Sequence, residues 1–165
     1  MELKVPPNGT RGAEMPRVLR WLFRLGIPLM VSRYRRRGGD MRFAGQQLGL
    51  LTTKGAKSGE RRQTLVGRFP DGDKADSWIV TATNGGARSH PAWFRNIAAH
   101  PDQVWLDILG VEVHVRPEMV EGPEHDEAYR RIVDAAPVFR DYPKKTDRNI
   151  PVIRLSAILQ EQPQG

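Results

Sequence analysis

The chain of 165 residues contains no cysteine. This absence excludes disulfide bonds, thiolate metal sites, iron–sulfur clusters and a cysteine nucleophile. It is typical of a reducing compartment, so we expect a cytoplasmic protein. The four histidines show no H-E-x-x-H or comparable spacing, and no metal site is expected.

Several other common signatures are missing. The sequence has no G-x-S-x-G nucleophile elbow, no P-loop and no G-x-G-x-x-G after a predicted strand. The most apolar stretch, residues 18–31, is interrupted by Arg20, Arg24 and Pro28. It is too short and too charged to span a bilayer core of about 30 Å. No small-residue cleavage site follows it, so no signal peptide is expected.

Positive charge is in excess. Lysine and arginine total 26 against 19 acidic residues, a formal net charge of +7. Such a surface attracts phosphates, polyglutamates, nucleic acid or anionic lipid, and composition does not choose among them. The length suits one domain that buries about 68–70% of its unfolded surface.

The N-terminal part divides into two segments. Residues 1–14 are rich in Pro, Gly and Asn and are expected to be loose. Residues 15–40 read as a basic amphipathic helix, which Pro28 should kink or end, and a cationic linker at 32–39. The helix would place one apolar face either on a membrane surface or on the domain, and we favour the domain. The residues of that face are Leu19, Leu22, Phe23, Ile27 and Met30.

Residues 41–160 are expected to form a single domain that consists mostly of strands. Alternating and β-branched runs predict strands at 48–51, 65–69, 77–83, 103–109, 111–115 and 149–155. Helices are expected at 91–99 and 123–136, and Pro151 should place the last strand at an edge or bulge. Because the strands do not alternate with long helices, the pattern predicts an α+β fold built on an antiparallel barrel or twisted sheet.

A basic loop joins the first two long strands. Lys54, Lys57, Arg61 and Arg62 face a single acid, Glu60. Glycines at 55 and 59 permit positive φ, so successive N–H groups can line an anion site. The alternative is a solvated turn, the usual fate of such a loop.

A second segment, residues 81–96, combines an Asn-Gly-Gly strand end with aromatic residues on the first turns of a helix. Exposed backbone, a helix N-terminus and an indole suit a flat, anionic heteroaromatic ligand. The alternative is that Trp93 and Phe94 pack in the core.

Three ordered motifs carry a family resemblance. They are L-L-T-T-x-G-x-K-S-G-x-x-R at 50–62, G-G-A-x-x-H-P-A-W-F-x-N-I-x-x-x-P at 85–101 and F-x-x-Y-x-x-x-T-x-R-x-I-P-V at 139–152. Together they resemble the deazaflavin-dependent nitroreductase and quinone reductase family, whose members use reduced coenzyme F420. The resemblance implies a split β-barrel like that of FMN-binding proteins, with a few short helices.

The resemblance also implies site residues. The coenzyme's phosphate and oligoglutamate tail would contact Ala56, Lys57, Ser58, Arg62, Gln63, Thr64, Leu65 and Val66. The deazaflavin ring would contact Thr81, Ala82, Thr83, Asn84, Ala92, Trp93, Phe94, Arg95 and Asn96. Family tyrosines over the substrate correspond to Ala136, Phe139 and Tyr142, of which Phe139 is expected to bind the cofactor and Tyr142 to be catalytic. Ala56 and Asn84 replace an arginine and a lysine of the family pattern, and Arg61, Arg62 and Arg88 are candidates to compensate.

The resemblance implies hydride transfer from reduced coenzyme F420 to a quinone, enone or nitroaromatic. The proton would come from water, Tyr142, Ser89 or His90. The alternatives are a barrel that binds FMN or haem, or a basic module that binds nucleic acid or a membrane surface through Arg33–Arg37. No nucleic-acid partner is expected. Peripheral membrane contact through the first helix and a homodimer both stay open.

Overall fold

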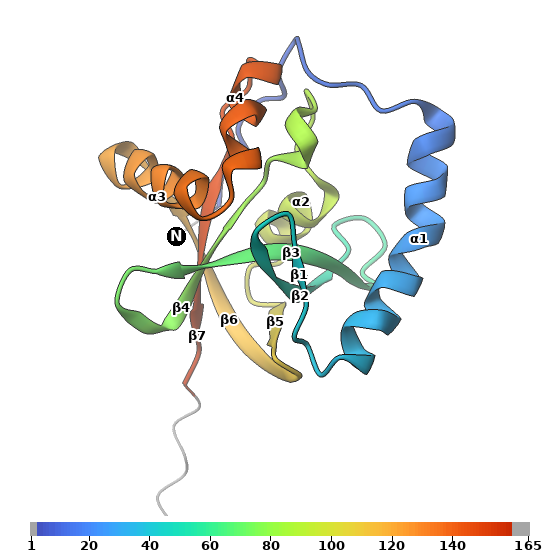
Figure 1. The fold of residues 1–165 in the computed structure, drawn as a ribbon, viewed down its shortest axis with the longest axis vertical. Helices are drawn as coiled ribbons and strands as arrows, with labels where there is room; N and C mark the ends of the chain where they lie inside the picture. Colours follow the sequence, from blue (N-terminus) through green and yellow to red (C-terminus); the bar gives the residue numbers. More distant parts are fainter. Residues whose placement is uncertain (1–2, 160–165) are drawn as a thin grey trace, which may run out of the picture.

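A closed antiparallel barrel forms the centre of the molecule in the computed structural model, which describes residues 3–159 (Figure 1). The strands follow the order β1-β2-β3-β4-β7-β6-β5, and β2 also pairs with β5. Their bounds are β1 (Arg42–Phe43), β2 (Gln46–Lys54), β3 (Arg61–Asp71), β4 (Lys74–Thr81), β5 (Val104–Ile108), β6 (Val111–Val120) and β7 (Val152–Ala157). The expected α+β antiparallel barrel is confirmed.

Alternation along the strands separates two apolar layers. Leu51, Val66 and Leu106 point into the barrel, where they meet Phe94 and Ile97 of α2 (Ala92–Ala99). Burying each of these large side chains contributes about 1.5–3 kcal/mol. The neighbouring positions of β2 point outward and are covered by the second half of α1 (Arg17–Arg36).

The last strand occupies a central place in the sheet. β7 lies between β4 and β6, so the expectation that Pro151 would place it at an edge or bulge is wrong. The strand begins at Val152, one residue after the proline. Pro151 therefore needs no N–H in the ladder, and its carbonyl accepts a hydrogen bond from the Ala82 N–H at 2.9 Å.

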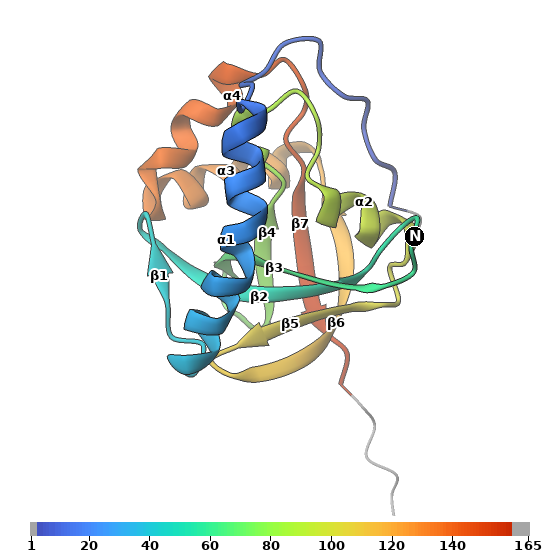
Figure 2. The same ribbon diagram turned by 90° about the vertical axis from the view of Figure 1, so that its right-hand side faces the viewer.

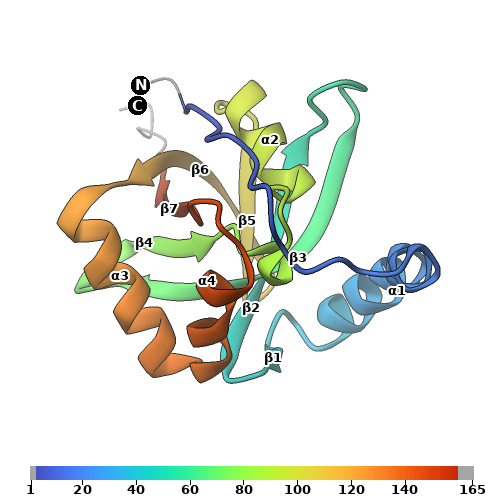
Figure 3. The ribbon, with the colours of Figure 1, turned by 90° about the horizontal axis from the view of Figure 1, so that it is seen from above.

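The helices other than α1 gather at one end and one side of the barrel. α3 (Gly122–Ala135), η2 (Pro137–Asp141) and α4 (Tyr142–Lys145) follow one another, and α3 lies on the side opposite α1 in Figure 3. Figure 2 looks onto α1, and α3 passes behind it. Ala128 and Ile132 of α3 pack on Phe69 and Ile79. Arg154 of β7 bonds both Asp71 of β3 and Glu124 of α3, and so ties this helix to the barrel.

Helix α1 differs from expectation. It runs through Pro28 and includes residues 32–36, which were predicted to be linker. Only Val31 and Tyr34 are buried. The expectation that its apolar face packs on the domain is therefore wrong for the first half of the helix. The exposed apolar residues of the helix before Val31 are Val18, Leu19, Trp21, Leu22, Phe23, Leu25, Leu29 and Met30.

The first described residues make fixed contacts. Residues 3–14 have no helix or strand, yet Leu3 is buried in the barrel core. The Gly9 N–H donates to the Arg88 carbonyl at 2.8 Å, and the Ala13 N–H donates to the Gly86 carbonyl at 2.9 Å. This segment was expected to be loose, and instead it is held against residues 86–90. Residues 1, 2 and 160 of the expected segments lie outside the described chain.

Candidate functional site

The basic loop between β2 and β3 is a tight turn. The Gly55 N–H donates to the Glu60 carbonyl at 2.8 Å, and the Gly59 N–H donates to the Gly55 carbonyl at 2.9 Å. A Cβ at position 55 would lie 2.5 Å from the Ser58 hydroxyl, so any larger residue there would displace this side chain. Ala56, Lys57 and Ser58 are exposed at its tip.

The cations of this loop differ in their partners. Arg62 pairs with Glu60 at 2.8 Å. Arg61 pairs with Glu112 of β6 at 2.6 Å and stacks over Trp105, so it is already engaged elsewhere. Lys54 and Lys57 form no ion pair with any described residue. The free positive charge therefore lies at the tip and the first strand end, where a polyanion can reach it.

Asn96 joins the loop to α2. Its side-chain oxygen accepts a hydrogen bond from the Ala56 N–H at 3.0 Å, and its amide nitrogen donates to the Thr53 hydroxyl at 3.1 Å. Asn96 is buried. Two segments that the sequence assigns to the coenzyme are thus fixed to one another by a residue whose two polar atoms are already satisfied within the protein.

The predicted residues of β3 divide between two faces. Gln63 bonds Thr52 and Arg35, and Leu65 packs with the layer under α1. Val66 lies in the barrel core. Because side chains alternate along a strand, Arg62 and Thr64 share the side of Val66. Residues 62–66 therefore do not present one continuous surface.

The strand end after β4 leaves backbone donors open. Thr81 donates its hydroxyl to the Pro151 carbonyl at 3.1 Å, and the Asn84 amide donates to the Ser89 carbonyl at 3.0 Å. Asn84 has a φ of 46°, in the left-handed region. Among the bonds made within residues 3–159, none uses the N–H of Thr83 or of Asn84.

Helix α2 presents the remaining predicted ring contacts. Phe94 is fully buried in the barrel core, so packing is its role. Trp93 is half-buried and meets Phe94 edge to face at 6.2 Å between ring centroids. Ala92 and Arg95 are exposed, and Ala82 is buried under the strand end.

Tyr142 lies beside the strand end. A Cβ on Gly86 would approach the Lys145 Cβ to 2.8 Å and the Tyr142 carbonyl to 3.3 Å, so α4 is packed directly on η1 (Asn84–Gly86). Burial raises the pKa of Tyr142 above its ordinary value, which keeps its hydroxyl protonated. Its ring meets Phe139 edge to face at 5.3 Å. Phe139 is itself buried against Phe69.

Arg148 is not among the residues predicted for the site, although it belongs to the third motif. It is buried, and it donates to the carbonyls of Ala82, Thr83 and Ala87. Only the fold reveals these contacts, because the partners lie 61 to 66 residues away in sequence.

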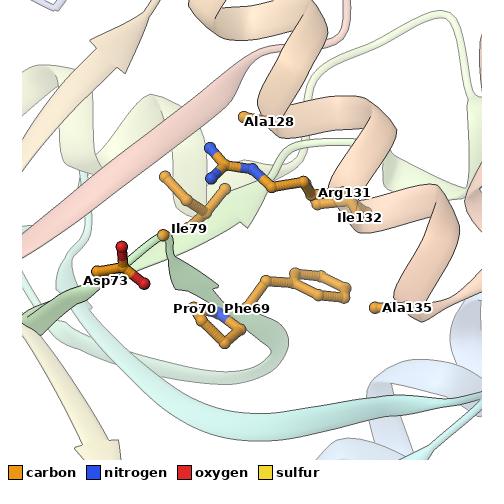
Figure 4. A pocket seen from close by; sticks show the side chains of 9 residues that line it. Phe69, Pro70, Asp73, Ile79, Ala128, Arg131, Ile132 and Ala135 are labelled. Carbon is orange, nitrogen blue, oxygen red and sulfur yellow. The ribbon is translucent and has the colours of Figure 1, made fainter.

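Two cavities lie away from the predicted coenzyme residues. One, of about 280 Å³, lies between α3 and the β3–β4 hairpin, with Phe69, Ile79 and Ile132 as apolar walls and Arg131 nearby (Figure 4). The other, of about 360 Å³, is lined by His125, Tyr129, Pro143 and Arg148. Neither cavity includes the basic loop. The candidate coenzyme site is therefore described by its hydrogen-bond donors and its charges and not by a cavity.

The donor set suits an anionic, flat cofactor. The described residues offer an exposed basic turn that Asn96 ties to α2, a half-buried indole on α2, and two unused backbone N–H groups at the strand end that precedes this helix. Within residues 3–159, no group of three or more His, Cys, Asp or Glu side chains could hold a metal ion. No helix of the described chain is long and apolar enough to cross a membrane.

Comparison with known proteins agrees with this chemistry. The family model described as F420H(2)-dependent quinone reductase matches residues 27–156. The chain belongs to this family. An F420H(2)-dependent quinone reductase of Mycobacterium tuberculosis is 32% identical over 117 residues, which cover 65% of this chain and 71% of that protein.

Solved structures give the same result. A structure of an F420-H2 dependent reductase, FDR-A, has a TM-score of 0.58 and 31% identity over 66% of this chain and 93% of its own. A domain-swapped dimer has a TM-score of 0.60 and 26% identity over 83% and 98%. The heme storage protein HutZ of Vibrio cholerae, at 10% identity and a TM-score of 0.51 over 81% and 92%, shows the fold alone.

The protein is therefore an F420H2-dependent reductase, an oxidoreductase whose cofactor is coenzyme F420. The expected hydride transfer from the reduced coenzyme to an electrophilic organic acceptor is confirmed at the level of the family. The alternatives of an FMN or haem barrel and of a nucleic-acid module are not favoured.

Proposed function

We propose that this family member reduces a quinone, with the coenzyme bound across the basic turn and the end of β4. The observation that carries the proposal is the link through Asn96, which fixes the exposed turn of Ala56 to helix α2. Reduced coenzyme F420 supplies the hydride when it is bound. The chain's own residues bind it, orient it and exclude water.

The tail and the ring have separate supports in this proposal. Lys57 and Ser58 at the tip of the turn, with Arg62 behind them, would hold the phosphate and glutamates, because charge-assisted hydrogen bonds suit such groups best. The open N–H groups of Thr83 and Asn84 would receive acceptor atoms of the ring. Trp93, half-buried beside Phe94, offers an apolar wall.

Tyr142 is the proposed proton donor. It lies next to η1, and its raised pKa keeps its hydroxyl proton through neutral pH. No hydrogen bond joins that hydroxyl to another described residue. The proton is therefore available to an acceptor oxygen that receives a hydride on the same side.

We further propose that the first half of α1 rests on an anionic membrane surface, where a lipid-soluble quinone would be met. Positions seven apart repeat one face of a helix, so the side that carries buried Val31 and Tyr34 continues back through Arg24 and Arg20. Leu22, Leu25 and Leu29 then face away from the barrel, and all three are exposed. The helix contains no acidic residue, which suits an anionic lipid surface.

A second copy of the chain is the other partner that could cover this exposed face of α1. One structural relative is a domain-swapped dimer. The basic composition of α1 favours lipid, because two copies would bring their arginines together. Vesicle flotation together with light scattering separates the two.

Fluorescence titration tests the main proposal. Purified protein is titrated with coenzyme F420 and, in parallel, with FMN, and turnover of the reduced coenzyme is then followed with a naphthoquinone. We expect micromolar binding of F420, loss of most of the fluorescence change in Trp93→Phe, and quinone-dependent oxidation. Binding of FMN without F420, or binding of F420 without turnover of any quinone, would contradict the proposal.

A further inference from the structure

Arg148 is a buried cation without an acidic partner. Only 6% of its surface is exposed, and no carboxylate of the described chain forms an ion pair with it. The neighbouring acid, Asp147, is exposed and is engaged with Thr10 and the Arg11 N–H. Burial of an unpaired charge is costly, so its retention in a site of this kind points to a role for the charge.

The Arg148 guanidinium donates hydrogen bonds to backbone carbonyls of residues 82–87. Nη2 donates to Ala82 O at 2.9 Å and to Thr83 O at 2.6 Å, and Nε donates to Ala87 O at 2.7 Å. Nη1 donates to His90 Nδ1 at 3.2 Å. His90 therefore accepts at Nδ1 and carries its proton on Nε2, which donates to the Pro6 carbonyl at 3.0 Å. Arg148 thus fixes both ends of residues 82–90.

The contact with two successive carbonyls sets the direction of two N–H groups. In a trans peptide the carbonyl and the following N–H point to opposite sides, and no cis peptide occurs among the described residues. Because Nη2 binds the carbonyls of Ala82 and Thr83, the N–H groups of Thr83 and Asn84 point away from the guanidinium. These two N–H groups donate a hydrogen bond to no described residue.

We propose that Arg148 is a positioning residue for the coenzyme, which aims the Thr83 and Asn84 N–H groups at the deazaflavin ring and strengthens them as donors. The positive charge lies at the carbonyl end of both peptide units, so it polarises their N–H bonds toward the opposite side. Such donors favour the electron-rich carbonyl oxygens of the ring. This inference rests on the proposed function of the site.

Two substitutions of Arg148 distinguish the role of its positive charge from the role of its planar set of N–H donors. Arg148→Met keeps the length of the side chain and removes charge and donors, and Arg148→Lys keeps the charge and a single donor group but loses the planar fork that reaches several carbonyls at once. Arg154→Met is the matched control, because Arg154 is also largely buried but bonds Asp71 and Glu124 away from the strand end. All variants are compared by thermal unfolding and by fluorescence titration with coenzyme F420.

We expect coenzyme affinity to fall roughly tenfold or more in Arg148→Met and less in Arg148→Lys, as for loss of a charge-assisted hydrogen bond. Arg154→Met should lose stability and keep its affinity. Unchanged affinity in folded Arg148→Met would overturn this inference alone. Absence of F420 binding by the unmodified protein would overturn the proposed function as well.

A measurement on the unmodified protein does not depend on how a variant folds. Amide proton signals of Thr83 and Asn84 are followed by NMR as coenzyme F420 is added. We expect both to move downfield more than the other amides of residues 81–90. Signals that stay in place while the coenzyme binds would overturn the inference.

Discussion

Asn96 accepts a hydrogen bond from the backbone N–H of Ala56 at 3.0 Å, and so ties helix α2 to the tip of the basic turn. Replacing it with alanine leaves that N–H and the Thr53 hydroxyl without a buried partner. We expect Asn96→Ala to lower the free energy of unfolding by about 1–3 kcal/mol and to weaken coenzyme binding. Chemical denaturation and F420 titration measure the two effects. Gln103→Ala, which loses only a contact with exposed Asp102, is the control. Full coenzyme affinity in Asn96→Ala would show that the turn is positioned without this link.

Charge reversal at the turn should weaken binding of the anionic tail. We expect Lys57→Glu combined with Arg62→Glu to reduce coenzyme affinity by well over roughly tenfold at low salt, and by less as salt rises. Arg116→Glu combined with Arg130→Glu changes the net charge by the same amount at two other exposed positions. This double variant is the control for a non-specific effect of net charge. Equal losses in the two double variants would remove the tail from this turn.

Gly86 should be more sensitive to a methyl group than its neighbour. Both Gly85 and Gly86 have positive φ, at 64° and 80°. A Cβ on Gly85 meets nothing within 4 Å, whereas one on Gly86 would lie 2.8 Å from the Lys145 Cβ. We expect Gly85→Ala to cost about 1–2 kcal/mol of backbone strain and Gly86→Ala to cost more and to displace α4. Equal unfolding free energies and equal turnover in the two variants would contradict direct packing of α4 on η1.

Tyr142 should remain a proton donor up to alkaline pH. Its ordinary pKa is 10.0, and burial raises the folded value above that. The neutral form is thus favoured in the folded state, and the contribution to stability is complete below pH 10.0 and is lost as pH rises through the folded pKa. We expect kcat to fall roughly a hundredfold in Tyr142→Phe, at the low end of the range for general acid catalysis. The pH profile of kcat checks the donor, and an unchanged kcat would assign the proton to water.

The outward face of α1 should bind anionic vesicles. We expect the protein to float with phosphatidylglycerol vesicles, less with phosphatidylcholine, and not after Leu22→Glu with Leu29→Glu. Val111→Glu, an exposed apolar position on the barrel, is the control. Light scattering gives the oligomeric state of the same samples. A dimer that these α1 changes disperse, without any vesicle binding, would assign the face to a second copy.

Local patterns were enough to predict the barrel and to propose candidate residues for the site. The alternation in β2 and β3, and Pro91 ahead of α2, predicted those elements within a few residues, because local chemistry decides them. The three motifs assigned the turn and the strand end to one coenzyme, and this assignment stays a prediction. The alternative that Phe94 packs in the core also followed from its residue type and from its position on the predicted helix.

The rest depended on contacts between distant residues. The pattern in α1 shows that an apolar face exists but not which way it points, and the structure turns Leu22 and Leu29 outward. Arg148 reads as a surface cation until its carbonyl partners are known. Burial of Leu3 could not be predicted from a segment rich in proline and glycine.

That burial bears on where the domain can be cut for expression. The family match begins at residue 27, and a protein shortened to that point would lose Leu3 from the barrel interior and the Pro6 carbonyl that accepts a hydrogen bond from His90. Arg148 and the end of β4 that it holds would then lose their contact with the N-terminal segment. We expect the shortened protein to unfold at a lower temperature, and an affinity tag is better placed at the C-terminus than next to this inserted leucine.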